Sequence, residues 1–153
     1  MYIDYEYYSS LYKTVPQEDF PRLCLKAQRK LDNYTTGIDG VRKLAYAFPV
    51  DEYTAQLVKA CMAELINAMY NAEKVQNSVG ITATESGVHS NVVTSVSAGN
   101  ESIHYAALNT ADARTASESA YKLIIYEYLV GAADANGVNL LYMGRYPYPV
   151  ATK

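Results

Sequence analysis

Apolar positions along the chain recur with helical spacing in several long segments, which predicts a mainly α-helical protein. From Phe20 to about Tyr34 they return every three or four residues, and Pro21 stands in the first turn, where proline is tolerated. A longer helix is predicted from Asp51 to about Asn77, roughly 40 Å at 1.5 Å per residue. One apolar stripe on it contains Tyr53, Leu57, Val58, Cys61, Leu65, Ala68, Met69 and Ala72.

A shorter helical segment is predicted near the start of the chain, between Tyr2 and Lys13, with Asp4 as its N-cap. The connection from Thr36 to Pro49 leaves room for a short helical turn.

The last predicted helix, from about Thr110 to Gly131, has apolar residues around almost its whole circumference. Only Glu118, Lys122 and Glu127 interrupt them. A helix that is apolar all round must be covered all round. One side can face the core, so we expect the other side to meet a β-hairpin or another subunit.

The segment from Ile81 to Tyr105 has a different character, because it is rich in Thr, Ser, Val, Asn and Gly and has no helical period. Short runs such as Val92 to Val96, with turn signals at Ser86-Gly87 and Ala98-Gly99-Asn100, predict a protruding β-hairpin or a small sheet. A loop without regular structure is the alternative. The prolines near the end predict an extended C-terminal tail.

Together these patterns predict a three- to four-helix bundle with a small β insertion between the second long helix and the last helix. We expect a single domain over residues 1–153. Its helical core spans about 4–78 and 110–133, its β-hairpin arm about 80–106, and its tail about 137–153.

Tyrosine is the unusual feature of the composition, with 16 copies against two Phe and no Trp. Its large apolar ring and polar tip suit surfaces that become buried on assembly. The net charge of −3 argues against a dedicated nucleic-acid binder. Two small basic clusters, at Lys26, Arg29 and Lys30 and at Arg42 and Lys43, are explained by solvated helix faces.

The sequence predicts no catalytic or metal site. His89 and His104 have no second ligand at a useful spacing, and Cys24 and Cys61 are better explained as small core residues. No nucleotide-binding or hydrolase motif occurs. We therefore expect no enzyme activity and no cofactor. The acidic N-terminus is unlike a signal peptide, and the longest apolar stretch, broken by Glu127, is too short for a membrane span.

The order of the segments resembles the head–tail connector proteins of long-tailed phages, also called adaptor or head-completion proteins. The resemblance covers nearly the whole chain, and the segments that carry it are Pro16 to Leu23, Lys30 to Gly37, Val58 to Leu65, Gly80 to Ser86, Ile103 to Tyr105 and Asn139 to Gly144. Two departures are a longer segment from Gly87 to Asn100 and Met143, which stands where the family usually has a basic residue.

This resemblance implies a structural virion protein, made in the host bacterial cytoplasm and placed in the phage neck. About twelve copies would form a ring beneath the portal protein and above a stopper or tail-completion protein. Genomic DNA would pass through the channel without sequence-specific binding, since an acidic subunit offers few phosphate contacts. No membrane is implied.

Two sets of residues are candidate contacts in this hypothesis. The candidate ring or neck interface in the arm consists of Ile81, Thr82, Val92, Val93, Val96, Ile103 and Tyr105. The candidate portal-docking tail consists of Leu140, Leu141, Tyr142, Met143, Arg145, Tyr146 and Tyr148. The alternative for each tyrosine is partial burial in its own monomer. Alternative functions are a stopper-type neck protein or a small helical binding or regulatory module of a prophage, expected as a dimer.

Overall fold

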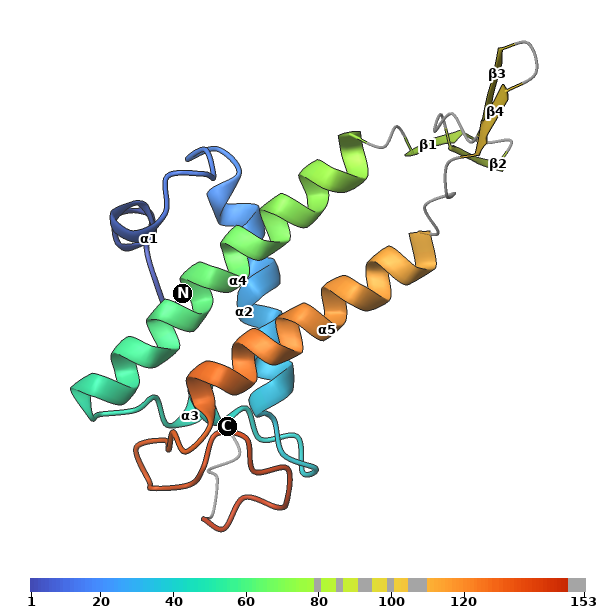
Figure 1. The fold of residues 1–153 in the computed structure, drawn as a ribbon. Coiled ribbons are helices and arrows are strands. Elements are labelled where there is room, and N and C mark those ends of the chain that lie inside the picture. Colours follow the sequence, from blue (N-terminus) through green and yellow to red (C-terminus); the bar gives the residue numbers. More distant parts are fainter. Residues whose placement is uncertain (79–80, 85–86, 91–94, 99–100, 105–109, 149–153) are drawn as a thin grey trace.

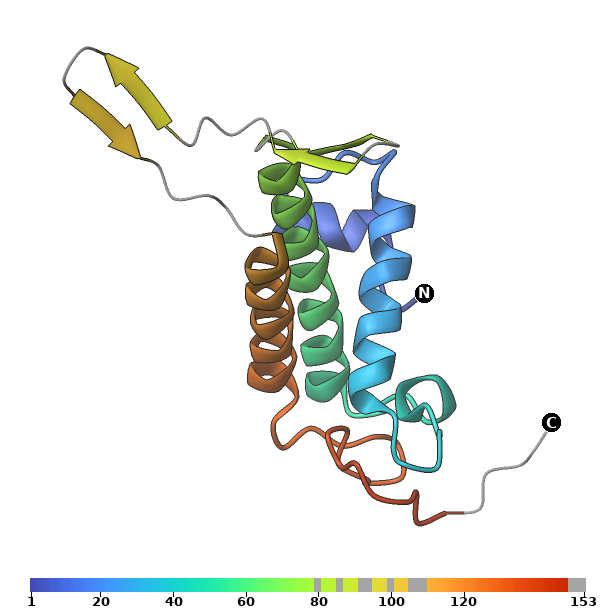
Figure 2. The same cartoon turned by 90° about the vertical axis from the view of Figure 1, so that its right-hand side faces the viewer.

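The protein is built around three long helices that pack side by side (Figures 1 and 2). The computed structural model describes residues 1–78, 81–84, 87–90, 95–98, 101–104 and 110–148, with side chains for 1–75 and 114–148. The helices in these ranges are α1 (Tyr5–Leu11), α2 (Phe20–Thr35), α3 (Lys43–Tyr46), α4 (Glu52–Ser78) and α5 (Thr110–Leu129). The prediction of a mainly α protein is confirmed.

Local sequence signals set the helix starts. The side chain of Asp4 accepts a hydrogen bond from the Tyr7 N–H at 2.8 Å and caps α1. Asp51 does the same for α4 by accepting from the N–H of Thr54 at 2.8 Å. Pro21 lies in the first turn of α2, whose buried face includes Leu23. These caps satisfy N–H groups that have no partner inside the helix.

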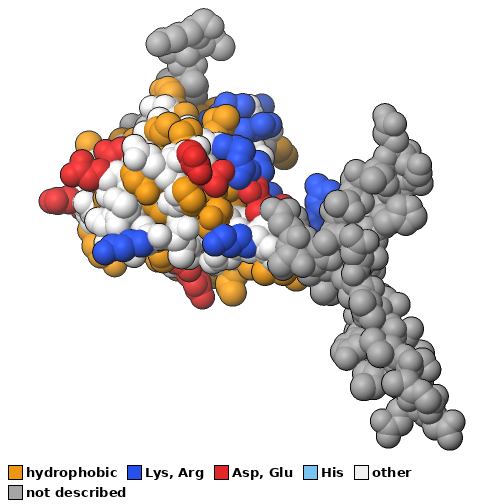
Figure 3. All heavy atoms as spheres, turned by 90° about the horizontal axis from the view of Figure 1, so that it is seen from above, with side chains coloured by type: hydrophobic (Ala, Val, Ile, Leu, Met, Phe, Trp, Pro, Cys, Tyr) orange, Lys and Arg blue, Asp and Glu red, His pale blue; other side chains and the backbone are white. Residues whose placement is uncertain are grey.

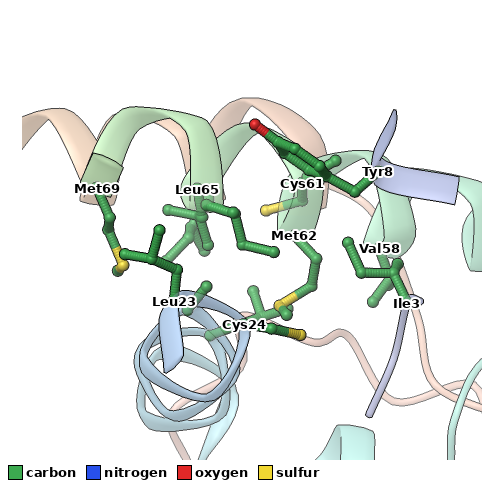
Figure 4. Close-up of a cluster of buried hydrophobic side chains, with 14 of the residues drawn as sticks. Ile3, Tyr8, Leu23, Cys24, Val58, Cys61, Met62, Leu65 and Met69 are labelled. Atoms are coloured by element: carbon green, nitrogen blue, oxygen red, sulfur yellow. The ribbon is translucent and has the colours of Figure 1, made fainter. Parts of the chain in front are cut away.

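Helix α4 lies at the centre of the core, with α2 and α5 both packed against it. Figure 4 shows Leu23 and Cys24 of α2 meeting Met62 and Leu65 of α4. The single-stripe prediction for α4 was wrong in two ways. Met62, Ala63 and Ile66 are also fully buried, whereas Tyr53 is 72% exposed. The reason is that neighbours cover α4 on more than one side of its middle turns.

Many of the tyrosines pack against other residues of the same chain. Tyr8 of α1 is fully buried, and its ring lies 5.6 Å from that of Phe20 at the start of α2. Tyr2 donates to Asp32 at 2.6 Å, and Tyr128 donates to Glu64 at 2.7 Å. The hydroxyls thus find partners within the monomer, as the alternative interpretation of the tyrosines expected.

Four short strands lie in the sequence between α4 and α5. The strands β1 (Ile81–Thr84) and β2 (Gly87–Ser90) form one antiparallel pair, and β3 (Ser95–Ala98) and β4 (Glu101–His104) form another. Their side chains lie outside the described residues. A protruding arm formed by this segment therefore stays a prediction.

The chain after α5 folds back under the bundle instead of extending away from it. Gly131 and Gly137 adopt positive φ angles of 80° and 77° at two of its turns, and Ala133 forms an isolated β-bridge with Asn139. Val138, Leu140 and Tyr146 are buried. The prediction of an extended tail over about 137–153 was wrong for its described part, residues 137–148, because polar contacts with the segment between α2 and α4 hold it in place.

Candidate interaction surfaces

The candidate docking tail divides into buried and exposed members. Leu140 and Tyr146 are buried, and Leu141 is partly buried against the core, so these three side chains contact the chain itself. The exposed members are Tyr142, Met143, Arg145 and Tyr148. Ile38, 84% exposed, lies beside them because its N–H donates to the Met143 carbonyl at 3.0 Å. An apolar surface of the tail and this loop therefore remains open to solvent.

Lys43 holds the tail against the bundle. Its ammonium is fully buried and donates to the carbonyl of Thr35 at 2.9 Å, that of Leu140 at 3.0 Å and that of Tyr142 at 2.5 Å. Burial lowers the pKa of Lys43, while Asp134 and Asp39 act in the opposite direction. The interpretation of Lys43 as part of a solvated basic face was wrong, since its three donors satisfy carbonyls at the end of α2 and in the tail.

A second polar cluster lies around Asp134, which is also buried. One carboxylate oxygen accepts from the N–H groups of Asn136 and Val138, each at 2.9 Å, and the other accepts from the Tyr146 hydroxyl at 2.5 Å. Burial, followed by this hydrogen bond, raises the pKa of Tyr146 to about 12. The Tyr146 N–H in turn donates to Asp39 at 2.7 Å. The tail is thus fixed at both Lys43 and Asp134.

The side chains of the candidate arm contacts lie outside the described residues. These are Ile81, Thr82, Val92, Val93, Val96, Ile103 and Tyr105. Their proposed role stays a prediction.

Helix α5 presents an apolar stripe to solvent on the side away from the core. Tyr121, Ile125 and Leu129 are buried, but Leu123, Tyr126 and Val130 are 58%, 57% and 56% exposed. Leu123 and Tyr126 lie on one face of α5, and Val130, directly after the helix end, continues this face because its N–H donates to the Tyr126 carbonyl at 2.9 Å. We call these three residues the α5 stripe. The apolar pattern predicts that the outer side of this helix meets a β-hairpin or another subunit, and no described part of the chain covers the stripe.

A groove of about 440 Å³ lies between α2, α4 and α5. Two cross-helix ion-pair groups border it. Glu73 of α4 accepts from Arg22 at 2.8 Å and from Lys26 at 2.6 Å, and these contacts lower the Glu73 pKa to about 2. Glu118 of α5 accepts from Lys30 at 2.6 Å. The sequence predicted that Lys26 and Lys30 belong to a solvated helix face. In the structure they also form ion pairs, Lys26 with Glu73 and Lys30 with Glu118.

Two arginines of this groove have no ion-pair partner among the described residues. Arg29 and Arg114 are exposed, and no described carboxylate forms an ion pair with either. The groove contains four of the chain's 13 basic residues but only two of its 16 acidic residues. Seen from above in Figure 3, the largest group of Lys and Arg side chains lies at one edge of the molecule, and acidic side chains gather at the opposite edge. The charge distribution on this face is therefore uneven.

The described residues do not meet the requirements of a metal site, a reactive thiol or a membrane span. Among them no group of three or more His, Cys, Asp or Glu residues could hold a metal ion. Cys24 and Cys61 are buried, and burial raises the pKa of the Cys61 thiol to about 12, which disfavours the reactive thiolate. None of the described helices combines the length and hydrophobicity needed to cross a bilayer.

The sequence matches no protein-family model, no curated protein and no solved structure. The resemblance to phage connectors thus stands on the order of the sequence segments alone.

Proposed function

We propose that this protein is a structural subunit of a phage head–tail connector, which assembles into a ring beneath the portal and extends the DNA channel. The observation that carries the proposal is the α5 stripe, Leu123, Tyr126 and Val130, because three large apolar side chains on one helix face favour burial against another chain. In a ring, this stripe would lie between neighbouring subunits.

The exposed tail residues support a contact with the portal. Tyr142, Met143 and Tyr148, together with Ile38, place aromatic and aliphatic side chains at one end of the bundle. Tyrosine and methionine are enriched in interface cores. We propose that these four residues, and not the buried Leu140 or Tyr146, form the docking surface. The arm at residues 80–106 would contact adjacent subunits or the next ring.

Native mass spectrometry, with and without the portal protein of the same phage, tests the proposal. We expect a closed ring of about twelve copies, alone or on the portal. A stable dimer that does not bind the portal protein would refute the connector function.

A matched pair of variants tests the α5 stripe. Leu123 and Leu11 are helical leucines of similar exposure, 58% and 52%. Leu123→Asp should abolish the ring, because a carboxylate would be buried without a partner in the subunit interface. Leu11→Asp should assemble normally. Equal assembly of both variants would show that the stripe is not the interface.

A further inference from the structure

We propose that the groove between α2, α4 and α5 binds an acidic corner of a second copy of this chain, made of residues 50–53. This inference rests on the proposed ring and specifies one of its contacts. The corner lies at the start of α4 and combines two exposed apolar side chains, Val50 and Tyr53, with two exposed acids, Asp51 and Glu52.

The charges of the groove and of the corner are complementary. The groove's own carboxylates are already neutralised, Glu73 by Arg22 and Lys26, and Glu118 by Lys30. Arg29 and Arg114 therefore remain as the cations that an incoming carboxylate would meet. Arginine forms bidentate pairs with carboxylates, which gives such a contact geometric specificity.

The apolar parts of the two surfaces also match. Met69 and Ala72 of α4 and the ring of Tyr121 of α5 line the groove beside the arginines. Tyr53, 72% exposed in the monomer, offers an aromatic ring one residue after Glu52. An aromatic side chain next to a carboxylate thus faces an aromatic and aliphatic lining next to arginines.

The corner of a subunit cannot reach the groove of the same subunit. Glu52 and Glu73 lie 21 positions apart on the straight helix α4 (Figure 1), which places them about 30 Å apart along its axis. The contact must therefore join two copies. Because it uses a different surface on each copy, it is a heterologous contact, the type that generates closed rings when the rotation closes.

Charge reversal tests the contact in the full-length chain at low ionic strength in the presence of portal. The double variant Arg29→Glu/Arg114→Glu should lower the assembled fraction at least about tenfold, and Glu52→Lys alone should lower it similarly. Combining all three substitutions should restore most of the assembly. Asp51 stays unchanged because it caps α4. Lys13→Glu and Glu6→Lys, at exposed positions that belong to neither the groove nor the corner, are the controls, and circular dichroism verifies that every variant folds.

A photo-crosslinker in place of Tyr53 gives an independent readout. In the wild-type assembly it should label peptides of the groove, from α2 around Arg29 or from α5 around Arg114, in a second copy. Labelling elsewhere, together with no rescue by the triple variant, would overturn the corner as the occupant.

The remaining outcomes separate this inference from the proposed function. If the wild-type chain forms a ring and the double arginine variant forms it equally well, the groove contact is wrong and the connector function stands. If the wild-type chain forms no ring even on the portal, both are wrong. If the double variant assembles normally but loses salt-dependent binding of duplex DNA, the groove is a phosphate site and the inference is overturned.

Discussion

Replacing Lys43 with methionine removes a buried ammonium while keeping a side chain of similar length. In the wild-type protein this ammonium donates to the carbonyls of Thr35, Leu140 and Tyr142. Methionine can fill the same space but can donate to none of them. The substitution therefore leaves three carbonyls, two of them in the tail, without their donor.

The expected loss of stability follows from these three contacts. A buried acceptor that loses its donor costs about 1–3 kcal/mol. Two terms reduce the sum: methionine avoids the desolvation cost of the ammonium, and local loosening lets water reach the tail carbonyls. We expect Lys43→Met to lower the free energy of unfolding by about 2–4 kcal/mol. For a chain of this size that corresponds to a fall in Tm of roughly 5–15 °C.

Urea unfolding followed by circular dichroism measures the global effect, and hydrogen exchange of residues 132–142 measures the local one. The midpoint should fall by about 1–2 M urea, and exchange in the tail should accelerate before the helices open. Lys13→Met is the control, since Lys13 is exposed. A loss below about 1 kcal/mol with unchanged tail exchange would refute the role that we assign to Lys43.

Three further predictions concern pH and packing. The pKa of Glu73, held at about 2 against an ordinary 4.5, means that its ion pairs stabilise the fold above pH 4.5 and are lost as the pH falls towards 2. The Tm of Glu73→Gln should therefore fall less steeply over this range, and parallel profiles would contradict the assignment. Ile66→Ala should lower the free energy of unfolding in urea by about 2–5 kcal/mol, and Tyr53→Ala by less than about 0.5 kcal/mol. Equal losses would contradict the burial of Ile66 and the exposure of Tyr53. Tyr146→Phe should cost about 1–2 kcal/mol at neutral pH through the lost bond to Asp134. Because the Tyr146 pKa is raised from 10 to about 12, the wild-type advantage should disappear between these values, and its persistence at pH 12 would exclude this cause.

The helix limits were predictable because their signals are local. The predicted helix from Phe20 to about Tyr34 corresponds to α2 at Phe20–Thr35, and the one from Asp51 to about Asn77 corresponds to α4 at Glu52–Ser78. Capping and first-turn preferences act within a few residues, so the sequence alone contains them.

The burial of Met62, Lys43 and Asp134 was not predictable in this way. Met62 is covered because more than one element packs against α4, and a periodic pattern marks one face only. Lys43 and Asp134 are buried because the tail folds back, whereas a sequence alone places charged side chains in solvent by default. The α5 stripe was signalled by the excess of apolar residues in that helix, whereas no sequence signal joins Arg29 to Arg114 across the groove.

The contacts of Lys43 have a consequence for the order in which the protein acquires its structure. Its carbonyl partners at Leu140 and Tyr142 follow it by 97 and 99 residues, so the ribosome makes them after all three long helices. Contacts of such high separation form late, because the intervening chain must first be ordered. During synthesis the Lys43 ammonium therefore remains hydrated. The end of the bundle that contains Lys43 packs against the tail only after the tail has left the ribosome. A stalled nascent chain would expose this end to chaperones and proteases.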